Sequence, residues 1–272
     1  MWLLVAKLAL TPAIVIATTL AGRRYGAAIS GWLVALPLMS GPITCFLAIE
    51  HGRGFAAHAS IGSLSGTLGE AAFCLGWVGA ARRWPWQYSL AAGSLGFACV
   101  GLIAEVLPLG PQLDVVIPLS AAAVLALVVA LRFVPQLAFE PAEAVLPHRF
   151  ELPARAVVAT AILLLITGLA TVLGARLSGL LTVYPLYTAV LASFAQRSHG
   201  IAAALRVLRG LLLGLFSFAA FYISLSVLLP RTSIAVAFGS ALVLALAIHA
   251  ASLWPLRRSL RAMHVAHEAS AA

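Results

Sequence analysis

Long runs of apolar residues, bounded by Gly, Pro or Arg, occupy almost the whole chain. A helix that crosses the hydrocarbon core of a bilayer needs about 20 mainly apolar residues. Runs that meet this length lie at 2–21, 26–48, 55–80, 88–108, 113–134, 153–174, 177–197, 201–228 and 232–254. The pattern predicts an all-α fold, a polytopic bundle of nine transmembrane helices, in which residues 135–152 form the one longer loop.

Composition agrees with this pattern. Of the 272 residues, 62% are hydrophobic and only 9% are charged, whereas soluble domains carry about 25% charged residues. The net charge of +9 resides in basic residues at the ends of the apolar runs, such as the pairs Arg23-Arg24 and Arg82-Arg83. This placement is typical of loops that anchor a membrane protein, so we predict lipid as the partner and exclude nucleic acid.

The basic residues also predict an orientation. If the nine runs alternate across the membrane, 13 Lys and Arg residues fall on one side and four, Lys7, Arg53, Arg176 and Arg231, on the other. Because positive residues concentrate in cytoplasmic loops, the N-terminus is expected outside and the C-terminus inside. The expected location is a bacterial inner membrane, with multiple passes.

An internal repeat appears when the chain is shifted by 148 residues. The aligned positions that matter most are Gly, Pro, His and Arg, because apolar residues match by chance in any membrane chain. Gly26, Ala27, Ser30, Gly31, Leu33, Pro37 and Leu38 meet Gly174, Ala175, Ser178, Gly179, Leu181, Pro185 and Leu186; His51-Gly52 meets His199-Gly200, and Gly62 and Gly66 meet Gly210 and Gly214. The match predicts a duplicated chain.

The repeat predicts two halves of opposite orientation. An odd number of spans separates the two copies, so the second copy enters the membrane from the other side. We therefore expect a first four-span repeat at 1–110, a connecting span and cytoplasmic loop at 111–150, a second, inverted four-span repeat at 151–254, and a basic tail at 255–272. Inverted repeats of this kind occur in many secondary transporters.

Matched prolines in the second and seventh runs predict a binding site. Pro37 and Pro185 fall near the middle of their spans, where a proline frees a backbone carbonyl that lipid cannot satisfy. Interrupted helices at corresponding positions of two inverted halves point to a midplane substrate site. The polar residues nearby, which we expect to contribute to that site, are Ser40, Thr44, Tyr184, Tyr187 and Thr188. A structural kink without a ligand is the alternative.

The third and eighth runs carry charged residues inside the predicted spans. Glu70 lies well inside the third run, and Arg206 and Arg209 lie inside the eighth. Since an unpaired charge in lipid costs several kcal/mol, we expect Glu70 to pair with one of these arginines or to share a wet cavity with both. Snorkelling of the arginines to the headgroups is the alternative. The Gly62/Gly66 and Gly210/Gly214 stripes are expected to pack the two halves together.

Together these features predict a secondary transporter of a small anionic or carboxylated solute, which works by alternating access. A flippase for a lipid or lipid-linked headgroup, an ion channel and a membrane scaffold are the alternatives. The four-plus-one-plus-four plan resembles that of duplicated fluoride channels, but those use a pore asparagine and this chain has no asparagine. The Ser-Gly-x-Leu-x-x-x-Pro-Leu repeat resembles segments of uncharacterised bacterial inner-membrane proteins, which implies location only.

The sequence predicts no enzymatic activity. Its Cys, His and Asp residues do not have the spacing of a metal site, and neither a phosphate-binding Gly-rich loop nor a Gly-x-Ser-x-Gly nucleophile motif occurs. No catalytic residue, metal or cofactor is therefore expected. The expected partners are the bilayer and a small-molecule or lipid substrate, and a homo-oligomer is compatible with the sequence.

Overall fold

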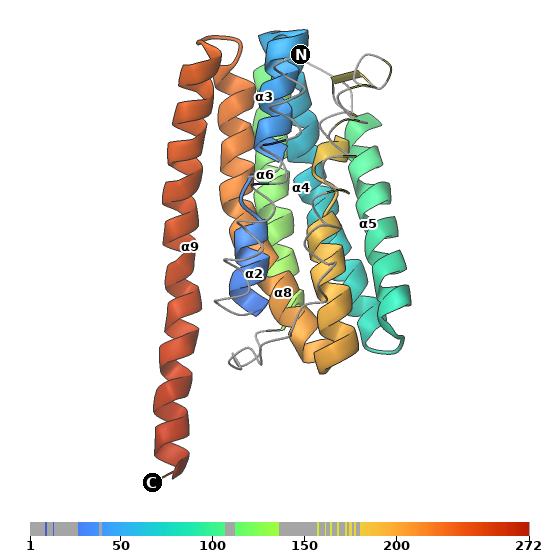
Figure 1. Ribbon diagram of the computed structural model, residues 1–272, viewed down its shortest axis with the longest axis vertical. Coiled ribbons are helices and arrows are strands. Elements are labelled where there is room, and N and C mark those ends of the chain that lie inside the picture. Colours follow the sequence, from blue (N-terminus) through green and yellow to red (C-terminus); the bar gives the residue numbers. More distant parts are fainter. Residues whose placement is uncertain are drawn as a thin grey trace.

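The computed structural model describes residues 27–37, 40–106, 112–135 and 180–271, with isolated positions elsewhere. All regular structure in these residues is helical (Figure 1). The helices are α2 (Ala27–Val34), α3 (Ser40–His51), α4 (Arg53–Ala81), α5 (Trp86–Val106), α6 (Gln112–Phe133), α8 (Leu186–Leu228) and α9 (Ile234–Ala271). The predicted all-α fold is confirmed for this part of the chain.

Four of the described helices are long and apolar enough to cross a membrane. The qualifying segments are Trp86–Ile103, Asp114–Phe133, His199–Leu228 and Ile234–Ser252, which correspond to four of the runs seen in the sequence. Large apolar side chains on three of these helices are exposed, such as Leu95 on α5, Ile117 on α6 and Val243 on α9. Such surfaces suit contact with lipid, so the protein is a membrane protein. The predicted runs 2–21 and 153–174 lie almost wholly outside the described residues.

Helix α4 occupies the inside of the bundle, where it packs against α3, α5, α6 and α8. Of its 29 residues, 20 are buried. Because other helices and not lipid surround it, α4 can carry Ser60, Ser63, Ser65 and Thr67, all of which are fully buried. Serine and threonine hydroxyls on a helix can bond the carbonyl one turn earlier, as Ser60 does with Ala56 O at 2.8 Å.

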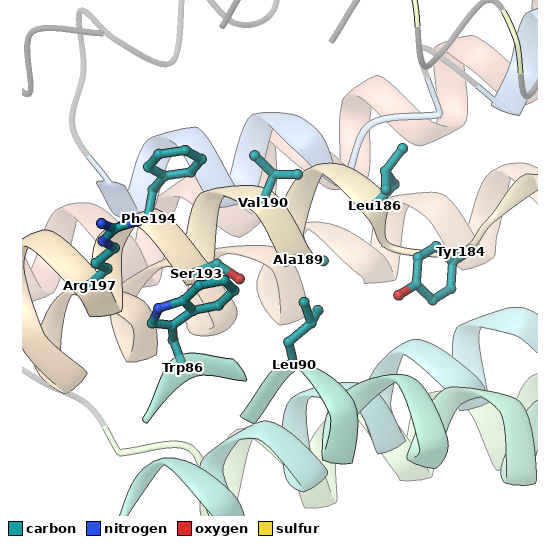
Figure 2. A pocket seen from close by; sticks show the side chains of 9 residues that line it. All are labelled: Trp86, Leu90, Tyr184, Leu186, Ala189, Val190, Ser193, Phe194 and Arg197. Atoms are coloured by element: carbon teal, nitrogen blue, oxygen red, sulfur yellow. The ribbon is translucent and has the colours of Figure 1, made fainter. Parts of the chain in front are cut away.

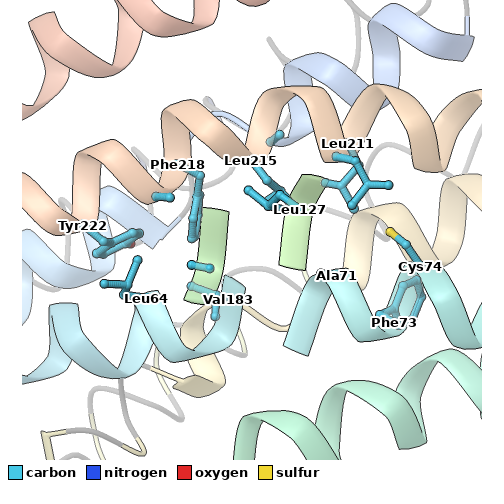
Figure 3. Close-up of a cluster of buried hydrophobic side chains, with 14 of the residues drawn as sticks. Leu64, Ala71, Phe73, Cys74, Leu127, Val183, Leu211, Leu215, Phe218 and Tyr222 are labelled. Carbon is cyan, nitrogen blue, oxygen red and sulfur yellow. The ribbon is translucent and has the colours of Figure 1, made fainter. Parts of the chain in front are cut away.

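The hydrophobic core joins α4, α6 and α8 (Figure 3). Leu64 and Phe73 of α4, Leu127 of α6, and Leu211 and Leu215 of α8 are all fully buried within it. These side chains come from parts of the sequence that are far apart, so the inner helices form one continuous core.

Prolines interrupt the helices at two corresponding places. Helix α2 ends at Val34, Pro37 lies in the gap, and α3 begins at Ser40. In the second half a helical segment ends at residue 182, and α8 begins directly after Pro185. Both proline carbonyls are satisfied within the chain, because Gly41 N donates to Pro37 O and Ala189 N donates to Pro185 O, each at 2.8 Å. Each predicted mid-span proline thus lies in a complete helix break.

Two glycines make a second pair of corresponding breaks. Gly52 separates α3 from α4 with φ 91°, and Gly200 interrupts α8 with φ 79°. Residues with a side chain rarely adopt positive φ, whereas glycine adopts it at little cost. The bend at Gly200 divides α8 into segments 186–199 and 201–228.

Helix boundaries therefore recur at the spacing seen in the sequence. Trp86 begins α5 and Ile234 begins α9, 148 positions later. Corresponding helices run in opposite directions in space: α4 and segment 201–228 of α8 are antiparallel, and so are α5 and α9 (Figure 1). A contact agrees with this arrangement, because Arg53 at the start of α4 donates to Thr232 O, just beyond the end of α8, at 2.7 Å.

The contacts of Gly66 and Gly214 link the two halves. A Cβ atom built on Gly66 would meet Val183 and Leu180, and one built on Gly214 would meet Ala35 and the carbonyl of Trp32. Ala35 and Val183, and likewise Trp32 and Leu180, are 148 positions apart. The two glycines therefore pack against residues that are related by the same 148-residue spacing. Close helix packing, as predicted for these glycines, is found at Gly66 and Gly214.

Replacing Gly214 with alanine is expected to destabilise the fold. The added methyl would lie 2.7 Å from Trp32 O and 3.2 Å from His249 Cε1, and overpacking of this kind costs about 1–3 kcal/mol. Thermal unfolding in detergent measures the effect. The matched control is Gly239→Ala, also in a helix, where a Cβ would meet nothing within 4 Å. Equal unfolding temperatures for the two variants would contradict the close packing at Gly214.

Candidate functional site

A group of buried hydroxyls lies where the two proline breaks meet. Thr44 Oγ1 of α3 lies 3.4 Å from the hydroxyl of Tyr222 in α8, and Ser63 Oγ of α4 lies 3.4 Å from Thr182 Oγ1. Ser40 and Ser63 also lie within hydrogen-bonding reach of Tyr222. We call Ser40, Thr44, Ser63, Thr182 and Tyr222 the central polar cluster. All five side chains are buried, with at most 7% of their surface exposed.

The helix breaks explain why the cluster forms. Ser40 is the first residue of α3, directly after the Pro37 break, and Thr182 is the last helical residue before Pro185. Both breaks therefore place hydroxyls beside unwound backbone in the interior of the bundle. Non-helical backbone at membrane depth is tolerated where protein or a water-filled cavity surrounds it, and discontinuous helices of this kind hold substrates in many transporters.

Two buried polar atoms, Glu70 Oε2 and Thr188 Oγ1, have no hydrogen-bond partner among the described residues. Glu70 is only 5% exposed. It lies two helical turns from Ser63 on the same face of α4, a distance of about 10 Å along the helix. Cys74 and Tyr222 lie within electrostatic range of its carboxyl group. Burial of a carboxyl group without a partner is costly, so packing does not account for Glu70.

Arg209 has a different role from the one expected. Its Nη1 donates to Leu131 O at 3.0 Å and to Val134 O at 2.6 Å, at the C-terminal end of α6. A cation there satisfies carbonyls that lack a helical partner and interacts favourably with the helix dipole. Glu70 forms no bond with Arg209 or Arg206 in the described part of the chain, so the expected ion pair is absent. Both arginines are only partly buried.

The other residues expected at the site lie at several places. Pro37 and Pro185 are buried at the breaks, and Ser40, Thr44 and Thr188 are buried beside them. Tyr184 instead bonds Ser94 of α5, with its hydroxyl 2.8 Å from Ser94 Oγ. The side chain of Tyr187 lies outside the described residues. The structure thus brings together the residues of α3 and the proline breaks, while the arginines and Tyr184 lie elsewhere.

Sequence reasoning missed Ser63, Thr182 and Tyr222. Ser63 precedes Glu70 by seven residues, and this spacing places two residues on one helix face, so it could have been found. Thr182 and Tyr222 reach the cluster only through tertiary packing, and no local signal marks them. Among the described residues no group of three or more His, Cys, Asp or Glu residues could hold a metal ion.

Comparisons with family models, with curated proteins and with solved structures found no match. The geometry of this chain is therefore the guide to its function. That geometry offers hydroxyls that can bond a dehydrated polar solute, together with a carboxyl group that can accept and release a proton.

Removing the carboxyl group of Glu70 is expected to leave stability unchanged or to raise it. Glu70→Gln keeps the side-chain shape but cannot carry a charge, and so avoids the cost of burying an unpaired carboxylate. Arg209→Gln is the contrasting variant, because it removes a charged donor from two carbonyls and is expected to cost about 1.5–3 kcal/mol. Thermal unfolding in detergent distinguishes them. A larger loss for Glu70→Gln than for Arg209→Gln would show that Glu70 has a structural role.

Proposed function

We propose that the protein is a proton-coupled secondary transporter of a small carboxylated or otherwise anionic solute. In this proposal the chain crosses a bacterial inner membrane nine times, and its two four-span halves are inverted copies. The connecting span is α6. The solute binds at the central polar cluster, and Glu70 carries the coupled proton.

The matched contacts of Gly66 and Gly214 are the main support for this proposal. A two-fold axis in the membrane plane, which exchanges the two halves, would turn one of these contacts into the other. The recurrence of the proline breaks, the glycine breaks and the starts of α5 and α9 at 148-residue spacing supports the same relation. In transporters built this way, exchanging the conformations of the two halves opens the site to the opposite side.

The burial of the central polar cluster fits an occluded state of this cycle. Thr44, Ser63 and Tyr222 are at most 1% exposed, so the solute would enter only after the helices around the cluster move. Hinge motions are absorbed by a few residues at the ends of elements. Pro37, Gly52, Pro185 and Gly200 supply such positions at the two ends of α3 and of segment 186–199.

Electrostatics would couple an anion to a proton on Glu70. Two negative charges about 10 Å apart repel each other by about 1.7 kcal/mol at an effective dielectric constant of about 20. That repulsion corresponds to roughly a 15-fold preference for binding the anion when Glu70 is protonated. The proton and a monovalent anion together move no net charge across the membrane, and the loaded site carries the same charge as the empty site with ionised Glu70. Loading therefore adds no charge to the apolar interior.

Proteoliposome uptake tests the proposed coupling. We expect an inward proton gradient to drive uptake of at least one of radiolabelled lactate, succinate or glutamate, and Glu70→Gln to abolish gradient-driven uptake. Asp114→Asn is the matched control, because Asp114 is an exposed acid in the first turn of α6 and its loss should leave the rate unchanged. Gradient-driven uptake that persists in Glu70→Gln would remove Glu70 from the mechanism. No uptake of any of the three solutes would contradict carboxylate transport.

Cysteine accessibility tests the conformational cycle without knowledge of the solute. Ser40 and Thr188 correspond in the repeat and are both buried. In a variant without Cys45, Cys74 and Cys99, Ser40→Cys and Thr188→Cys are each expected to react slowly with a membrane-impermeant maleimide. A scaffold would keep both positions unreactive in folded protein, which would contradict alternating access.

A further inference from the structure

A groove lies between α5 and the first segment of α8. It has a volume of about 260 Å³. Trp86 and Leu90 of α5 line one wall, and Ala189, Ser193 and Arg197 of α8 line the other (Figure 2). Tyr184, Leu186, Val190 and Phe194 complete the lining. Most of this surface is apolar, and its charged residue lies at one end.

The length of the groove corresponds to one leaflet. Leu186 and Arg197 are 11 residues apart on α8, or about 16 Å at the helical rise of 1.5 Å per residue. The hydrocarbon core of a bilayer is about 30 Å thick, so this length is close to that of one layer of acyl chains. A single acyl chain could therefore lie along the groove, with its headgroup at the end that carries Arg197.

Basic and aromatic residues gather at that end. Arg82 and Arg83 lie in the turn between α4 and α5, directly before Trp84 and Trp86. Trp77 Nε1 donates to Oε1 of Gln196, the residue before Arg197, at 2.9 Å, and Gln196 Nε2 lies 3.5 Å from Ser89 Oγ. Because Trp77 and Ser89 lie on either side of the turn, this part of α8 lies beside it. Tryptophan side chains prefer the level of the headgroups. The groove thus opens at a basic interface.

Two polar groups in the groove have no partner within the described part of the chain. Ser193 is 8% exposed, and its hydroxyl forms no hydrogen bond. The guanidinium of Arg197 is exposed and bonds to none of the described residues. Buried polar groups are normally satisfied, so the hydroxyl of Ser193 points to a ligand that supplies an acceptor or donor.

The other half of the molecule provides an internal comparison. The 148-residue spacing aligns Arg197 with Ile49, Trp86 with Ile234 and Ser193 with Cys45. The fold therefore forms at those positions without the arginine, the tryptophan or the serine. Helix packing does not require these side chains in the groove, which leaves binding as their role.

We propose that this groove binds an anionic phospholipid of the cytoplasmic leaflet. Its acyl chain lies between α5 and α8, and its phosphate pairs with Arg197. The cytoplasmic leaflet is the source because anionic lipids attract the basic residues there. This site is separate from the central polar cluster and does not depend on transport activity.

Native mass spectrometry of the full-length protein in detergent tests the lipid site. The probes are dioleoyl phosphatidylglycerol and dioleoyl phosphatidylcholine, which share acyl chains but differ in net charge. We expect the wild type to bind phosphatidylglycerol at least fivefold more tightly, since one arginine near the surface contributes about fivefold. Arg197→Gln should lose about fivefold in affinity for phosphatidylglycerol, and Arg197→Lys should keep most of it.

Two further variants separate the groove from general charge. Ser193→Leu fills the groove and removes an unpartnered hydroxyl, so it should weaken binding of both lipids without lowering the unfolding temperature. Arg231→Gln removes an exposed arginine just beyond the opposite end of α8. It should change the affinity for neither lipid. Equal binding of the two lipids by the wild type, or an Arg197→Gln variant that binds like the wild type, would overturn the proposal. So would competition by soluble glycerol phosphate at equal concentration, because the site would then recognise a free anion.

Discussion

Close approach of inner helices is the constraint on which this structure depends. Gly66 of α4 lies against Val183, and Gly214 of α8 lies against Ala35 and Trp32. In lipid, helices associate through van der Waals packing and polar contacts, because the hydrophobic effect does not favour one apolar surface over another. The two glycines let the backbone of each inner helix reach a broken helix of the other half. The breaks are thereby enclosed, and the carbonyls of Pro37 and Pro185 are satisfied inside the protein.

The sequence predicted those features that depend on local chemistry. Apolar runs predicted helices such as α6 and α9, and Pro37, Pro185, Gly52 and Gly200 marked the breaks, because proline and glycine act on the backbone directly. The role of Arg209 was not predictable, since its acceptors Leu131 and Val134 are distant in sequence. Charge alone suggested Glu70 as its partner. Carbonyls at the end of a helix also attract a cation, and no sequence pattern reveals which helix end will lie nearby.

Residues that differ between aligned positions of the two halves indicate which side chains the fold does not require. Where the two halves agree, as at Gly66 and Gly214, the residue serves packing. Where they differ, one half shows that the fold forms without the residue: Phe218 corresponds to Glu70, and Ile49 corresponds to Arg197. Both polar residues occupy positions that an apolar side chain fills in the other half. This asymmetry is the physical reason to propose proton coupling for Glu70 and lipid binding for Arg197.

The orientation of His51 and His199 tests the proposed inversion most directly. These residues correspond in the repeat, and each directly precedes a glycine break. In a variant without native cysteines, His51→Cys should react with an impermeant maleimide added outside intact cells, whereas His199→Cys should react only after permeabilisation. Labelling of both cysteines from the same side would contradict the inverted arrangement, and with it the alternating-access account.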